Sequence, residues 1–153
     1  MTRRLNNSGG DLRFTIYDLR ATLKNNADLG IHDFMTREEM KQRTKAFANR
    51  IVKLCSALPS NWVAVTLGKQ LLRSGTSVGA NYRAVCRAKS SSDFINKLRI
   101  VEEECDESLF WMELLVDNEL VKAARLQSLM KEANEILAIV VSSAKTARTT
   151  RRA

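Results

Sequence analysis

The chain has 153 residues, of which 44 % are hydrophobic, and a formal net charge of +8. This size and composition suit one globular domain with an extension, and a basic chain favours anionic partners such as nucleic acid. Only six glycines and one proline are present, which favours long helices over a β-sandwich or barrel. No apolar run approaches the roughly 18–20 residues of a bilayer span, and no secretory leader pattern is present. We therefore expect a cytoplasmic protein with no membrane contact.

The first 35 residues differ from the rest of the chain and predict an N-terminal extension. Residues 11–24 have the spacing of one short helix, so the extension is either a flexible tail or an accessory helix docked on the domain. Thr36 and Glu39 then match a capping box, in which each side chain bonds the backbone of the other. We expect the folded domain to span residues 36–148, followed by a basic tail at 149–153.

Four amphipathic helices are predicted in the domain, because apolar residues recur every three or four positions. Their expected ranges are 37–58, 62–89, 93–117 and 125–147. Pro59 ends the first helix, and the Ser90–Ser92 turn supplies a cap for the third. Helices of this length with short connections indicate an all-α fold, an antiparallel up-down-up-down four-helix bundle.

The second helix contains a pair of glycines one turn apart, Gly75 and Gly79, on or beside its apolar face. Glycine inside a helix costs about 1 kcal/mol relative to alanine. We therefore expect these two positions to permit close approach of a neighbouring helix. The surrounding SGTSVGAN stretch is not a phosphate-binding loop, since it lacks a GK[ST] ending and a preceding strand.

A row of cations on the second helix is the main candidate binding surface. At 100° per residue, four side chains fall within about an 80° arc that carries no acid. A row of this kind suits a phosphate backbone, and no aromatic residue lies among the cations, so base stacking is not expected. Pairing with the Glu102–Glu104 block, in the same or another subunit, is an equally open alternative. The predicted nucleic-acid-binding residues are Lys69, Arg73, Arg83 and Arg87 of the row, with Lys89 and Lys97 beyond it.

The third helix carries a second apolar patch away from its core stripe. A helix in a monomeric bundle needs only one apolar stripe, so a second one that contains aromatic residues predicts burial against another subunit. A wide core face at a tapered end of the bundle would give the same pattern. The predicted oligomer-interface residues are Ile100, Phe110, Trp111 and Leu114.

No residue pattern indicates catalysis, a metal or a cofactor. The single histidine, His32, precedes the bundle, so a Ser-His-Asp site, a Cys-His site and a Glu-x-x-His di-iron site all lack their imidazole. The acids of residues 102–107 wind around several faces of their helix. Cys55, Cys86 and Cys105 lie far apart within helical patterns and are expected to be small buried apolar residues in a reducing compartment.

Two stretches, LLRSGTSVGANYRA and DFINKLRIVEEECDESLFWMELL, resemble a known family. It comprises the small four-helix proteins encoded in intervening sequences of bacterial 23S rRNA genes, formerly called S23 ribosomal proteins. The match covers residues 35–148, and TREEMKQRTKAFANRIVKL fits the start of the family. The resemblance implies a ring-like homo-oligomer, with a pentamer as the expected form. It also implies kinship with the accessory variability protein of diversity-generating retroelements, a basic pentamer that associates with reverse transcriptase and nucleic acid.

The function expected from these observations is non-enzymatic. The first hypothesis is an oligomeric four-helix bundle that binds RNA or DNA through a basic surface, without strong sequence specificity. The alternative is a protein-interaction adaptor, for example an accessory subunit for a reverse transcriptase.

Overall fold

The structure is a computed structural model that describes residues 35–152, and within that range the chain is all-α. The predicted helix at residues 11–24 and the predicted His32 position lie outside the described residues. The helices are α2 (Arg37–Ser56), α3 (Trp62–Val85), α4 (Ser91–Asp117) and α5 (Ala123–Arg152). The prediction of four helices in this part of the chain is confirmed.

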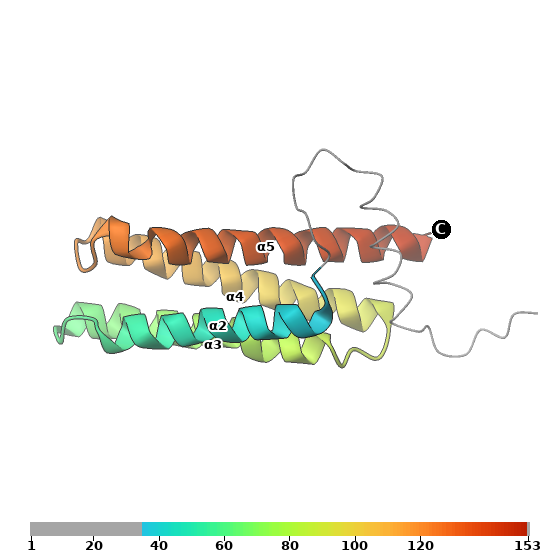
Figure 1. Cartoon of the computed structure of the whole chain (residues 1–153), viewed down its shortest axis with the longest axis horizontal. Coiled ribbons are helices and arrows are strands. Elements are labelled where there is room, and N and C mark those ends of the chain that lie inside the picture. Colours follow the sequence, from blue (N-terminus) through green and yellow to red (C-terminus); the bar gives the residue numbers. More distant parts are fainter. Residues whose placement is uncertain (1–34, 153) are drawn as a thin grey trace, which may run out of the picture.

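Each helix packs antiparallel against the next one in the chain, and α2 also contacts α5 (Figure 1). The start of α2, the α3–α4 connection and the end of α5 therefore lie at one end of the molecule. The other two connections lie at the opposite end. One core runs through all four helices. Its largest fully buried side chains include Phe47 of α2, Leu71 of α3, Met112 of α4 and Ile136 of α5.

Helix starts follow the predicted capping chemistry. Thr36 caps α2 in a complete capping box, in which its hydroxyl accepts from the Glu39 amide at 3.1 Å and the Glu39 carboxylate accepts from the Thr36 amide. At α4 the Ser90 hydroxyl accepts from the Asp93 amide at 3.1 Å, and Asp93 accepts from the Lys89 amide at 2.9 Å. Because Ser90 is itself the cap, α4 begins at Ser91 and not at residue 93 as expected.

Three helix ends differ from the predicted ones. The helix α2 stops at Ser56, two residues before the expected end at residue 58. The helix α3 stops at Val85, because the amides of Arg87 and Ala88 turn back to carbonyls three residues earlier, at 3.0 and 3.1 Å. Such tightened turns commonly end an α-helix. Arg87 and Lys89 consequently lie in the α3–α4 connection and not on α3. At the other extreme, α5 continues to Arg152, beyond the expected end at residue 147.

The glycine seam on α3 brings α2 and α3 into close contact, as predicted. A Cβ atom at Gly75 would lie 2.7 Å from Cγ1 and 2.8 Å from Cγ2 of Ile51, and one at Gly79 would lie 3.1 Å from the carbonyl oxygen of Thr44. All three distances are shorter than ordinary van der Waals contacts. The two helices can approach this closely only because these positions lack a side chain.

None of the four described helices has the combined length and apolar character needed to cross a membrane.

Candidate nucleic-acid interface

The candidate surface is the outer face of α3 and the connection that follows it. Asn61 caps the start of α3, where its side chain accepts a hydrogen bond from the Ala64 amide at 2.9 Å. The apolar stripe of the helix faces the core. The side opposite this stripe carries Lys69, Arg73 and Arg83, and all three are exposed. No acidic residue occurs in α3 to neutralise them. The local charge of this face is therefore positive along its length.

The cations at the end of α3 lie beside the start of α2. Arg83 contributes to lowering the pKa of the Glu38 carboxyl, although hydrogen bonds from Lys41 and Gln42 contribute more. Arg87 and Lys89 are exposed in the connection to α4. Lys89 helps to lower the pKa of Asp93, for which the Lys97 ammonium is the main cause. The carboxylates of Glu38 and Asp93 therefore already accept hydrogen bonds from neighbouring donors.

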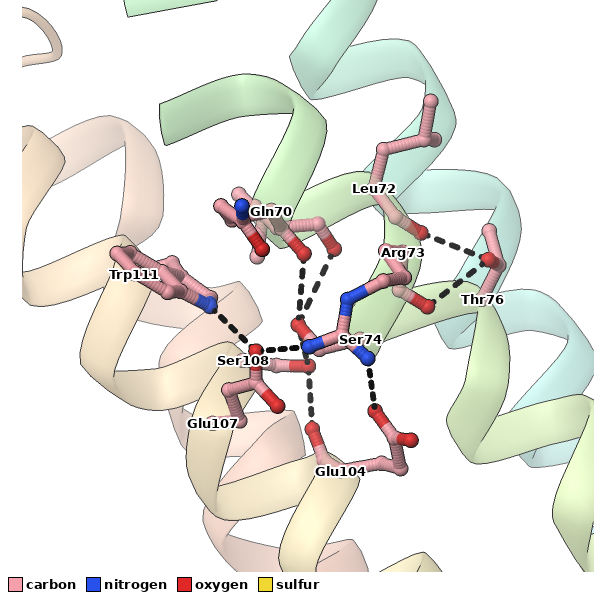
Figure 2. Close-up of polar contacts among 10 residues, drawn as sticks. Gln70, Leu72, Arg73, Ser74, Thr76, Glu104, Glu107, Ser108 and Trp111 are labelled. Atoms are coloured by element: carbon pink, nitrogen blue, oxygen red, sulfur yellow. Dashed lines mark hydrogen bonds and ion pairs between the residues drawn. The ribbon is translucent and has the colours of Figure 1, made fainter. Parts of the chain in front are cut away.

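Arg73 does not extend freely into solvent but reaches across to α4. Its guanidinium lies between two glutamates, as Figure 2 shows. It forms an ion pair with Glu107, and its Nη1 lies 3.8 Å from Oε2 of Glu104. The pairing alternative is therefore realised within one chain at Arg73, with Glu104 and Glu107 as the acids and not the whole Glu102–Glu104 block. The side chain of Arg73 nevertheless remains 55 % exposed.

The two glutamates beside Arg73 have different environments. Glu107 accepts from the Trp111 indole at 3.0 Å, and this bond, with the one from Arg73, holds the pKa of its carboxyl below the ordinary value. Burial has the opposite effect on Glu104, whose pKa is raised even though Arg73 partly offsets the shift. The Oε2 atom of Glu104 is buried and has no hydrogen-bond partner among the described residues. Arg73 is thus held mainly by Glu107.

Behind this cluster, two buried hydroxyls connect α3 to α4. The Oγ atoms of Ser74 and Ser108 lie 3.0 Å apart, and each also bonds a carbonyl of its own helix (Figure 2). Because both side chains are fully buried, this polar contact is shielded from water. Arg73 and Glu107, which directly precede these serines in the sequence, pair across the same α3–α4 interface.

The six predicted binding residues therefore fall into two groups. Arg73 and Lys97 have intrachain partners, since Lys97 pairs with Asp93 one turn earlier on α4. The others are exposed and form no ion pair within residues 35–152. They are Lys69, Arg83, Arg87 and Lys89.

One residue of this face was missed by sequence reasoning. Trp62, the first residue of α3, is 79 % exposed, the highest value among the exposed large hydrophobic residues of the described chain. At 100° per residue it lies about 20° from Lys69 and between Lys69 and Arg73 around the helix. The expectation that no aromatic residue accompanies the cations is therefore corrected. The signal in the sequence was the seven-residue spacing from Trp62 to Lys69, which places both residues on nearly the same face of a helix.

The predicted oligomer-interface residues on α4 do not share one environment. Ile100 and Phe110 are 43 % and 50 % exposed, whereas Trp111 and Leu114 are half-buried. Trp111 packs on the core edge and stacks edge-on against Phe110, with ring centroids 4.9 Å apart. Ile100 and Phe110 are thus the two members that a second subunit could cover directly. Trp111 is partly buried against the core, as the alternative of a wide core face expects.

The described residues contain no candidate metal centre, and their thiols are weakly acidic. No group of three or more histidine, cysteine, aspartate or glutamate side chains within residues 35–152 could hold a metal ion. Burial raises the pKa of Cys55 to about 11 and that of Cys105 to about 12, so neither thiol forms the reactive thiolate readily. Burial also raises the pKa of Cys86. The surface with the clearest chemistry is therefore the cationic one.

The fold and this surface define the class as a small antiparallel four-helix protein with a basic outer face on its second described helix. The family model for the 23S rRNA-intervening sequence protein matches residues 36–142. The chain belongs to this family.

A solved structure supports the same assignment. It is the crystal structure of a protein of unknown function from the S23 ribosomal protein family of Bacteroides thetaiotaomicron, with 39 % sequence identity and a TM-score of 0.66. The match covers 69 % of this chain and 98 % of that one. No match was found among curated proteins. The resemblance noted from the sequence is therefore confirmed at the level of the family.

Proposed function

We propose that the protein is a non-enzymatic module that binds the phosphate backbone of nucleic acid through the outer face of α3 and the α3–α4 connection. The observation that carries the proposal is the group of four exposed cations, Lys69 and Arg83 on α3 and Arg87 and Lys89 in the α3–α4 connection, which form no ion pair among the described residues. The helix α3 itself contains no acid. Each such cation can displace counterions condensed on a phosphate. Backbone contacts of this type carry little sequence information.

The expected salt dependence follows from the number of free cations. Four phosphate contacts give a slope of about −3 to −4 in log affinity against log salt concentration. Raising salt from 50 to 200 mM should then weaken binding by roughly 50- to 150-fold. Arg73 and Lys97 add to this only where a phosphate displaces their carboxylate partners, so they contribute less than the four unpaired cations.

We also propose that the module acts as a homo-oligomer, with the pentamer that the family resemblance implies as the expected form. Exposed Ile100 and Phe110 on α4 support this assembly, since a second copy would remove both from water. Repeating the cationic face around an assembly would raise affinity for a long polyanion without any new contact.

The test compares two triple variants with the wild-type protein in a binding assay with RNA and DNA. Replacing Lys69, Arg83 and Arg87 by glutamine should weaken binding at least tenfold and flatten the salt dependence, while helicity measured by circular dichroism is retained. The matched control removes three exposed cations of the α4–α5 connection and α5, outside the cationic face of α3, and should bind like wild type. Its positions are Lys122, Arg125 and Lys131. Equal losses in both variants, or an affinity that does not change with salt, would refute the proposal.

The second candidate function is a protein-interaction adaptor, of the kind found in the accessory protein of diversity-generating retroelements. The exposed Phe110 side chain, stacked on Trp111, is the observation that favours it. Replacing Phe110 by serine should then abolish capture of a reverse transcriptase. A Phe110→Ser protein that still captures the enzyme would count against the adaptor.

A further inference from the structure

The exposed indole of Trp62 has no role in the fold of the described chain. The side chain is 79 % exposed, and the start of α3 is already capped by Asn61. A single exposed apolar side chain is ordinary on a protein surface. Trp62, however, is accompanied on the same helix face by Val65 and Leu72, which are 41 % and 38 % exposed. Lys69 lies between these residues, so the patch combines apolar area with positive charge.

Distances along α3 relate the indole to the cations. At 1.5 Å per residue, Trp62 precedes Lys69 by about 10 Å and Arg73 by about 17 Å along the helix axis. Arg83 lies about 15 Å beyond Arg73 on the same side. A polyanion that follows this row from Arg83 to Lys69 therefore reaches Trp62 at the end of its path.

We infer that this face selects single-stranded nucleic acid, with an unpaired base stacked on the indole of Trp62 and the adjoining phosphate held by Lys69. The inference rests on the proposed function and adds the substrate class. An aromatic ring next to a track of cations is the combination by which proteins bind single strands without sequence preference. In a duplex the faces of the bases are covered by their neighbours, so an indole on a convex helix surface gains nothing from it.

A protein partner is the competing occupant of the same patch. A shallow groove between α2 and α3 adjoins it, lined by apolar residues that include Val52, Leu58 and Pro59. The charge around Trp62 favours nucleic acid, because α3 has no acid and the groove itself is lined by Lys69 and by no acidic residue. A docking protein segment would have to be acidic to match this rim, and the exposed row continues far beyond the groove toward Arg83.

The test uses a Trp111→Phe background, in which Trp62 is the only tryptophan of the chain. The fluorescence of Trp62 should be quenched by an oligothymidylate and not by a DNA duplex of equal length. Replacing Trp62 by alanine should weaken oligothymidylate binding by about 5- to 150-fold, the range expected for loss of one stacked base. Duplex binding and its salt dependence should stay unchanged, and Trp62→Phe should retain part of the preference. Val141→Ala, at an exposed apolar residue of α5, is the control and should leave the preference intact.

The outcomes separate this inference from the function on which it rests. If Trp62→Ala binds single strands and duplexes as tightly as the background protein, stacking is refuted while backbone binding stands. Equal weakening toward both substrates also refutes it, because the loss then comes from the fold or the charge. A change in oligomer mass without loss of single-strand affinity would assign the patch to protein contact. Absence of salt-dependent binding to either substrate would instead overturn the proposed function.

Discussion

The close contact of α2 and α3 allows a quantitative test at Gly75. Replacing Gly75 by alanine improves helix propensity by about 1 kcal/mol, because glycine is the poorer helix former. The new Cβ, however, would lie 2.7 Å and 2.8 Å from two carbon atoms of Ile51, a side chain with 0 % exposure. Overpacking of a closed core costs about 1–3 kcal/mol. We therefore expect Gly75→Ala to lower the free energy of unfolding by about 1 kcal/mol.

Gly68 is the matched control on the same helix. A Cβ there would lie 2.7 Å from the terminal Cδ1 of Leu58, a half-buried side chain that can rotate away. The gain in helix propensity should then dominate, so Gly68→Ala should leave stability unchanged or raise it by up to about 1 kcal/mol. Opposite signs of the change in unfolding free energy for the two glycine-to-alanine substitutions would separate the effect of packing from that of helix propensity.

A double-mutant cycle identifies the atoms responsible. Ile51→Ala removes Cγ1 and Cγ2, the two atoms nearest to a Cβ at Gly75, and alone should cost about 2–5 kcal/mol. In that background Gly75→Ala should stabilise by about 1 kcal/mol, which gives a coupling energy of about 2 kcal/mol. Urea unfolding followed by circular dichroism, at one protein concentration for all variants, measures each value. Additivity of the two substitutions within about 0.5 kcal/mol would refute the steric account.

Three further predictions concern charges and thiols. Glu107→Gln should free Arg73 and raise nucleic-acid affinity by roughly two- to fivefold in a binding titration, since its carboxylate competes with phosphate; unchanged affinity would exclude that competition. Arg43, paired with Glu132 at 2.6 Å, holds the pKa of that carboxyl below its ordinary 4.5. Glu132→Gln should therefore lower the free energy of unfolding by about 1 kcal/mol at pH 7, and the difference from wild type should vanish as acid protonates Glu132. Burial raises the pKa of Cys105 to about 12, so this thiol should react with iodoacetamide at pH 7 far more slowly in folded than in urea-unfolded protein, as peptide mass spectrometry would show.

The four helices could be predicted from the sequence because the spacing of apolar residues alone defines their buried faces. Phe47, Leu71, Val101 and Ala133 all lie where this spacing places them and are fully or almost fully buried. The ends of helices were less predictable, since they depend on local hydrogen bonds. Whether α3 stops at Val85 is decided by amides that turn back to carbonyls three residues earlier, and residue type does not encode this choice strongly.

The positions of the candidate-site cations could be predicted from the sequence, but their ion-pair partners could not. The angular arithmetic placed Lys69, Arg73 and Arg83 on one face of α3, and they are exposed there. Their partners depend on how far α4 is shifted along α3, and the sequence of neither helix states that shift. For this reason the acid bonded to Arg73 is Glu107, which lies outside the block first considered as its partner.

The glycine seam also has a mechanical consequence for anything that lies along α3. With its backbone close to Thr44 and Ile51 of α2, α3 cannot slide along α2 without opening these contacts. The charged residues of α3 are therefore held at nearly constant intervals along the helix axis. A ligand with a flexible backbone must adapt its own conformation to those intervals, and the loss of entropy on binding falls mainly on the ligand.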